Sequence, residues 1–169
     1  MSINNMDQLL DELSKKQSDR GFMADMRSGL RFSTRMNAWP VIARFCDLAD
    51  PRSRIYEVIA GLYAMHPIVC NDKNMGQLCR ELQAESGDLP DDEKESSMSK
   101  RFKRLLDADR EEMCELVIRI VMYAKSKEKP VDYKTLGKDM LFWNQRTKRE
   151  WANGFWGENG ESKTKKEDK

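Results

Sequence analysis

The chain has 169 residues, of which 39% are hydrophobic and 35% are charged, and its formal net charge is +1. This length suits one compact unit or two small subdomains that share a core, and the composition is not that of a disordered chain. The sequence has no apolar run long enough to span a bilayer and no basic and apolar start typical of a secretory signal. We therefore expect a cytoplasmic protein without a membrane partner.

Apolar residues recur at helical spacing with almost no strand-like alternation, which predicts an all-α fold. In the first half, helices are predicted over residues 6–13, about 19–35, from 39 onward, 50–67 and 74–86. Asp50 is predicted to cap the fourth of these helices, with Pro51 at its first helical position.

Residues 85–95 hold six acids against one lysine, with a glycine and a proline, which is typical of an exposed linker. Four further helices are predicted after it. We therefore predict a helical bundle built from two small helical subdomains. Its parts are an N-terminal subdomain (1–84), an acidic linker (85–97), a C-terminal subdomain (98–156) and a disordered tail (157–169).

The sequence contains few residues or motifs that indicate an enzyme. It has one histidine, His66, and no phosphate-binding glycine loop, dinucleotide fingerprint or metalloprotease motif. The four cysteines are scattered without metal-ligand spacing, so we expect reduced thiols and neither a metal nor a cofactor.

The stretch "RGFMADMRSGLRFSTR", residues 20–35, concentrates arginine without lysine in a nearly neutral chain. On one helix, Arg20, Arg27, Arg31 and Arg35 would fall within an arc of about 80°. Guanidinium groups suit phosphates because they are bidentate and weakly hydrated. This pattern favours a nucleic-acid-binding face, and the alternative is that these arginines pair with acids elsewhere, such as those of residues 85–95.

Two further basic clusters follow. "KRFKR", residues 100–104, lies at the start of a helix, where cations oppose the helix dipole unless an anion is near. Arg146, Lys148 and Arg149 lie between Trp143 and Trp151. We expect these two tryptophans to belong to the core and not to form a platform on which bases stack.

The order of these pieces resembles the small subunit of the type I-E CRISPR surveillance complex, Cascade, known as the CasB family. The matching segments are "DRGFMADMRSGL", "WP", "PRSRIYEVIAGLYAMHP", "NMGQLCREL", "SKRFKRLLDADREEM", "PVDYKTLGKDMLFWN" and "REWANGFW". They cover about residues 18–156. The resemblance implies a non-enzymatic, all-α subunit, usually in two copies, which touches the other Cascade subunits. It also implies contact with guide RNA and target DNA.

The resemblance implies which basic residues of this chain match the family's basic positions. Ser28 stands where the family has a second arginine after Arg27, so Arg31 is the expected substitute; Ile118 likewise departs beside Arg119. With Arg20 from the helical face, the predicted nucleic-acid-binding residues are Arg20, Arg27, Arg31, Arg52, Arg101, Arg104, Arg110, Arg119, Lys148 and Arg149.

We expect these residues to contact nucleic-acid backbone and to stabilise guide-RNA-directed R-loops in antiviral defence, without reading sequence. Two alternatives remain. One is a sequence-specific helix-turn-helix regulator formed by "YKTLGKDMLFWNQRTKREW", and the other is a purely structural helical scaffold.

Overall fold

The structure is a computed structural model that describes residues 3–88, 91 and 94–158. Within them the regular secondary structure is helical, joined by turns and loops, and one isolated parallel bridge links Val69 and Val131. The all-α prediction is therefore confirmed. In chain order the helices are α1 (Ile3–Lys15), α2 (Arg20–Ser28), the 3-10 helix η1 (Arg35–Asn37), α3 (Trp39–Ile42), α4 (Ser53–Met65), α5 (Met75–Ser86), α6 (Ser97–Asp107), α7 (Arg110–Ser126), α8 (Tyr133–Leu141) and α9 (Gln145–Trp156).

Six of the described helices, α2 and α5–α9, begin where the sequence supplies a side-chain oxygen for a free backbone N–H group. At α5 the cap is reciprocal, because Asn74 accepts from Gln77 N–H while the Gln77 side chain accepts from Asn74 N–H. The other side-chain caps are Asp19, Ser96, Asp109, Asp132 and Asn144.

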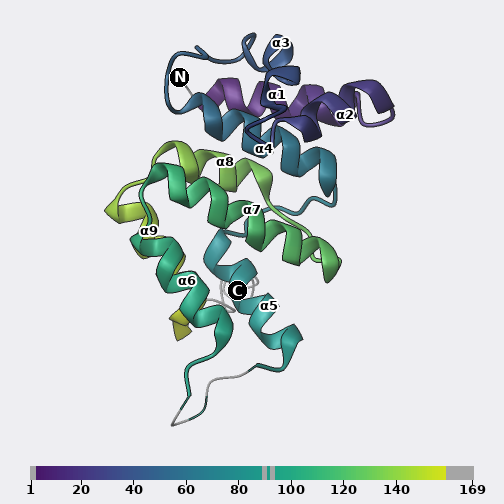
Figure 1. Cartoon of the computed structure of the whole chain (residues 1–169). Coiled ribbons are helices and arrows are strands. Elements are labelled where there is room, and N and C mark those ends of the chain that lie inside the picture. The colour runs from purple at the N-terminus through teal and green to yellow at the C-terminus, as the bar shows by residue number, and fades with distance from the viewer. Residues whose placement is uncertain (1–2, 89–90, 92–93, 159–169) are drawn as a thin grey trace, which may run out of the picture.

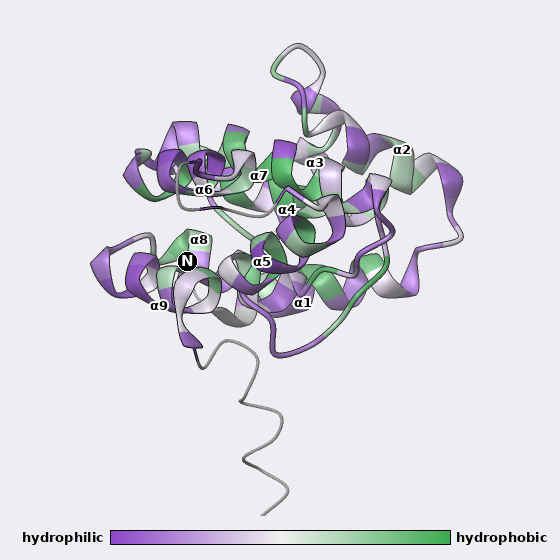
Figure 2. Cartoon of the chain, turned by 90° about the horizontal axis from the view of Figure 1, so that it is seen from below, coloured by the Kyte–Doolittle hydropathy of each residue, from purple (hydrophilic) through white to green (hydrophobic). Residues whose placement is uncertain are grey.

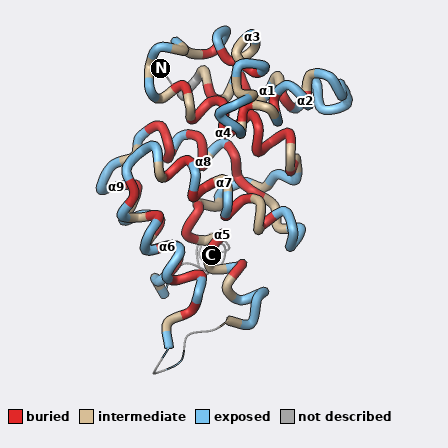
Figure 3. Tube along the Cα trace, in the orientation of Figure 1, coloured by how far each residue is buried: buried red, intermediate tan, exposed pale blue. Residues whose placement is uncertain are grey.

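The helix α4 is almost entirely buried. Eleven of its thirteen residues are buried, and it packs against α1, α2, α7 and α8. Figure 1 shows α1–α4 at one end and α5, α6 and α9 at the other, with α7 and α8 between them. In Figure 2 hydrophobic residues mark α4 and α7, and Figure 3 shows the buried residues running continuously from one end to the other.

Helix contacts cross the predicted division of the chain in both directions. α5 packs on α6 and α9, while α8 packs on α1 and α4. The helices of the predicted subdomains 1–84 and 98–156 thus share one core, and their division remains a prediction. α5 extends to Ser86, the predicted end of this helix, and is closed by Gly87, which has a φ of 71°. The predicted disordered tail lies outside the described residues, apart from Gly157 and Glu158.

The crossing of α5 and α9 depends on a glycine. A Cβ atom at Gly76 would lie 1.8 Å from the carbonyl oxygen of Trp151. Trp151 is fully buried, and its indole Nε1–H donates to the Asp139 carboxylate at 2.7 Å. Burial raises the pKa of Asp139, and the indole hydrogen bond partly opposes this rise. The prediction that this tryptophan belongs to the core is confirmed.

The helix predicted over residues 19–35 is shorter, because α2 ends at Ser28. The Arg54 guanidinium, on α4, donates to the carbonyl oxygens of Gly29 and Leu30, and Thr34 Oγ1 donates to the Ser28 carbonyl oxygen. These bonds satisfy carbonyls that a continuing helix would use itself. The prediction of one arginine-lined helix is therefore wrong.

The start of α4 also differs from the prediction. The helix begins at Ser53, while Pro51 and Arg52 form a turn. The Asp50 carboxylate accepts from the guanidinium of Arg52 and from its backbone N–H at 2.8 Å, and these hydrogen bonds lower the pKa of Asp50. Asp50 therefore caps this turn and not the helix.

Candidate nucleic-acid interface

A basic groove lies between α6 and α7. Phe102, on α6, is fully buried, and its ring lies 4.7 Å from that of Phe155 on α9. Because this face of α6 is turned to the core, Arg101 and Arg104 lie on the exposed side of the helix. The groove has a volume of about 380 Å³ and is lined by Met98, Arg101, Arg104, Leu116, Arg119, Ile120 and Tyr123.

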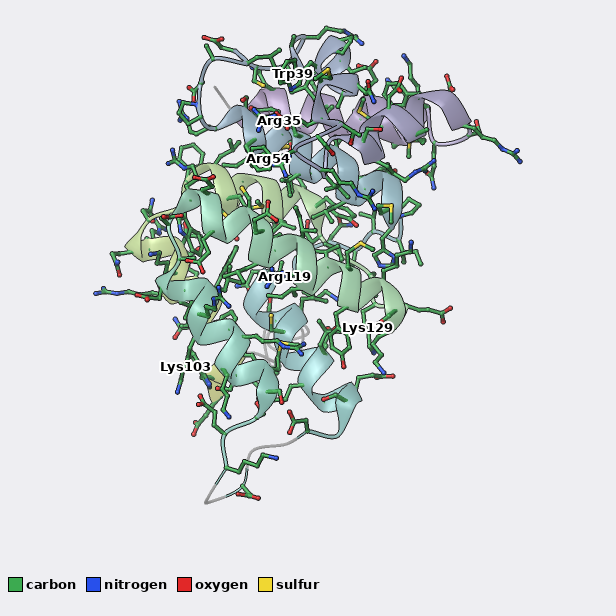
Figure 4. All side chains as sticks on the ribbon, viewed as in Figure 1. Arg35, Trp39, Arg54, Lys103, Arg119 and Lys129 are labelled. Atoms are coloured by element: carbon green, nitrogen blue, oxygen red, sulfur yellow. The ribbon has the colours of Figure 1, made fainter. Side chains whose placement is uncertain are left out.

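The charges of this α6–α7 groove are strongly unbalanced. Arg104 donates to Glu112 Oε1 at 3.0 and 3.1 Å, and its side chain is still 63% exposed. Arg101 and Arg119 are exposed and have no ion pair within the part of the chain that the structure describes. Of these three guanidinium groups only that of Arg104 pairs with a carboxylate, and such a surface attracts an anion. Figure 4 shows Arg119 on α7, near the middle of the molecule.

A second group of unpaired arginines lies at the opposite end of the molecule. Arg20 and Arg27 share one face of α2, and Arg31 lies in the turn after it. All three are exposed, and none forms an ion pair among residues 3–88, 91 and 94–158. Because α2 and α6 lie at opposite ends in Figure 1, the structure does not bring these residues to the α6–α7 groove.

Other arginines near α4 pair with acids. Arg54 Nη1 lies 3.0 Å and Arg35 Nε lies 3.8 Å from the same carboxylate oxygen of Glu57, whose side chain is 1% exposed. Arg52 pairs with Asp50 at 3.2 Å. Acid pairing, the alternative predicted for the arginines of residues 20–35, is therefore confirmed for Arg35, but its partner is not in residues 85–95. Figure 4 shows Arg35, Arg54 and Trp39 together.

The remaining predicted residues lie apart from one another. Arg110, at the start of α7, is exposed and lines a separate groove of about 450 Å³ together with Phe32, Arg35 and Arg54. On α9, Lys148 holds its ammonium 5.1 Å from the centre of the Trp143 ring, and Arg149 is exposed. The structure therefore brings together Arg101, Arg104 and Arg119, and distributes the other seven predicted residues over other surfaces.

Apolar residues of α7 lie beside these arginines in the groove. Leu116, Ile120 and Tyr123 follow one another at helical spacing on α7, and they form the floor and one end of the groove. Arg119, next to Ile120 in the chain, lies at the edge of the same face. An arginine beside such a face, opposite two arginines of the preceding helix, is the signal that could have predicted the groove.

The cysteine and histidine side chains are buried or half-buried in the fold. All four thiols are free, and burial raises the pKa of Cys46 to about 11 and that of Cys114 to about 12. His66 is buried, with its Nε2 2.6 Å from the Lys129 carbonyl oxygen. No group of three metal-ligating side chains occurs in the described ranges. No helix within those ranges is both long and apolar enough to cross a bilayer.

These features define an all-helical protein with a basic groove between two helices. The sequence matches the family model described as CRISPR-associated protein Cse2 (CRISPR_cse2) over residues 22–156. The chain therefore belongs to the Cse2 family, as its resemblance to the CasB small subunit predicted. No curated protein sequence matches it.

Solved structures share this fold. A Cse2-family CRISPR-associated protein from Thermus thermophilus is 22% identical, with a TM-score of 0.73, and the match covers 90% of this chain and 97% of that one. CasB from M. ruber is 20% identical, with a TM-score of 0.73 and coverage of 96% and 98%. A chain of a CRISPR RNA-guided surveillance complex is 18% identical, with a TM-score of 0.73 and coverage of 90% and 92%.

Proposed function

We propose that this protein is a non-catalytic subunit of a type I-E Cascade surveillance complex, in which the α6–α7 groove contacts nucleic-acid backbone and stabilises the R-loop. The observation that carries the proposal is the convergence of Arg101, Arg104 and Arg119 on one groove, where only Arg104 pairs with a carboxylate. Family membership and the likeness to a chain of a surveillance complex support the assembly.

The proposed mechanism is electrostatic. An RNA–DNA heteroduplex is about as stable as the DNA duplex that it replaces, so modest contacts to the strands shift the balance. The groove arginines stand on two packed helices, so ordering them on a phosphate costs less entropy than ordering a flexible loop. Each contact also releases counterions, which predicts a steep dependence on salt. No sequence readout is needed, because the guide RNA supplies it.

The proposal includes the partners that the resemblance implies. These are the other Cascade subunits, guide RNA and target DNA, with two copies of this chain in each complex and no cofactor. Arg20, Arg27 and Arg31 form a second exposed basic surface, which we propose contacts nucleic acid away from the groove. Arg110, Lys148 and Arg149 are exposed or half-buried cations that remain predicted contacts, and Arg52 remains one despite its pairing with Asp50.

The test uses a complex reconstituted with the partner subunits and guide RNA. A variant that combines Arg101→Ala, Arg104→Ala and Arg119→Ala is expected to enter the complex at normal stoichiometry and to shorten the lifetime of the R-loop. The matched control is Arg44→Ala, because Arg44 is 56% exposed, pairs with Glu12 and lies outside the groove. Native mass spectrometry measures stoichiometry, and strand displacement measures lifetime.

Three results would contradict the proposal. Unchanged lifetimes with normal assembly would show that the groove does not stabilise the R-loop. Loss of the groove variant from the complex would favour the purely structural scaffold. Sequence-specific binding of duplex DNA by the protein alone would favour the helix-turn-helix regulator.

A further inference from the structure

The α6–α7 groove has an apolar floor that phosphate contacts do not explain. Its arginines lie around Leu116, Ile120 and Met98, which are 8%, 5% and 4% exposed, and the half-buried Tyr123 closes one end. The Lys127 ammonium lies 5.8 Å from the centre of the Tyr123 ring, which adds a cation at this end. A ligand that filled this groove would need an apolar, flat part as well as negative charge.

Phosphate contacts alone need only a basic surface, because a phosphate stays outside on the rim. The volume of the groove, about 380 Å³, lies within the range of small-ligand pockets. Its combination of apolar floor, tyrosine ring and surrounding guanidinium groups matches the two halves of a nucleotide. The base would lie on the floor, and the flanking phosphates would meet the arginines.

We propose that the α6–α7 groove holds an unpaired nucleobase, which contacts Leu116, Ile120 and Tyr123 while Arg101 and Arg119 bind the neighbouring phosphates. This inference rests on the proposed function and deepens it. A base inside a duplex is stacked on both faces and cannot enter the groove without being extruded. The groove therefore selects unpaired nucleotides over duplex by shape, without reading the identity of the base.

Charge favours a nucleic acid over a protein segment as the occupant. Three guanidinium groups line the groove and only Glu112 pairs with one of them within the described part of the chain. The 450 Å³ groove beside Phe32 differs, because Asp50 and Glu111 lie among its arginines. A polyanion with flat apolar rings therefore fits the α6–α7 groove better than an ordinary protein surface does.

The test compares two strands that have the same phosphates. The full chain is titrated with a short thymidine oligonucleotide and with its abasic counterpart of equal length, and fluorescence anisotropy reports binding at low salt. The thymidine strand is expected to bind at least about fivefold more tightly. Tyr123→Ala should reduce this ratio toward one, whereas Phe32→Ala, which removes an exposed aromatic ring outside the groove, should leave it unchanged.

The outcomes separate this inference from the proposed function. Equal binding of the two strands would overturn the base pocket and leave backbone contact intact. Failure of the full chain to bind either strand would contradict both. Tighter binding of a duplex than of the single strand would exclude selection for unpaired bases. An acidic, tyrosine-containing peptide of equal charge that bound more tightly than the thymidine strand would assign the groove to a protein partner.

Discussion

Replacing Glu57 by glutamine is expected to destabilise the protein by about 3 kcal/mol, although the two side chains have nearly the same size. The Glu57 carboxylate is 1% exposed and accepts hydrogen bonds from Arg54 Nη1 at 3.0 Å and Trp39 Nε1 at 3.3 Å. Arg54 is itself only 11% exposed. Removing one partner of a buried ion pair leaves an uncompensated charge, which costs about 3–5 kcal/mol.

We take the lower end of that range because Arg54 keeps other partners. Its guanidinium still donates to the carbonyl oxygens of Gly29 and Leu30 and lies 3.6 Å from the half-exposed Glu115 carboxylate. For a chain of this length the change corresponds to a fall in Tm of about 6–12 °C. The loss of stability should be greatest at the contact where Arg54 joins the turn after α2 to α4.

Urea unfolding at neutral pH measures this effect, with Glu12→Gln as the control. Glu12 pairs with Arg44 at 2.7 Å, but that arginine is 56% exposed, so the control should lose about 1 kcal/mol or less. A loss of similar size in the two variants would refute the reasoning, because it would show that the Glu57 pair is no stronger than a surface pair.

Three further predictions follow from single contacts. Gly76→Ala should lower the free energy of unfolding in urea by about 3 kcal/mol or more, because its Cβ would strike the Trp151 carbonyl oxygen. The control Gly21→Ala, whose Cβ would meet nothing within 3.4 Å, should be neutral or stabilising. Equal effects of the two substitutions would refute the close contact at Gly76. Burial raises the pKa of Asp139, so its protonated form stabilises the fold at acid pH and this contribution is lost as pH rises through the folded-state pKa. Asp139→Asn should therefore gain stability relative to wild type between pH 4 and neutral pH, and a difference independent of pH would contradict this sign. Arg119→Ala should make the negative slope of log affinity against log salt for a single strand shallower by about 0.7, and an unchanged slope would exclude a phosphate contact there.

Periodicity predicted most of the helices. Met6, Leu9 and Leu13 are buried along the helix predicted over residues 6–13, and α5 with its cap Asn74 matches the helix predicted over residues 74–86. These features depend on neighbours in the chain, so the sequence contains the information locally.

The end of α2 was not predictable in this way. The stretch from Arg20 to Arg35 has helical spacing throughout. Arg54, however, lies twenty-five residues after Gly29 and donates hydrogen bonds to the carbonyl oxygens that follow the end of α2. Arg35 then points to Glu57 and leaves the predicted face. Tertiary contacts of this kind override local propensity, and no spacing rule reveals them.

The candidate groove was predicted in part. The basic cluster around Arg101 and Arg104 was identified from its place at a helix start, and Arg119 from the family resemblance. What the sequence could not show is that α6 and α7 pack so that all three surround one apolar floor.

The central claim is that the α6–α7 groove holds nucleic acid in the assembled complex. Ultraviolet cross-linking of a reconstituted complex that contains an R-loop, followed by mass spectrometry of the peptides, tests it most directly. The account predicts nucleotides attached to peptides from α6 and α7, with Tyr123 among the modified residues. Attachment only to peptides from α1 and α2, or none on this chain, would contradict it.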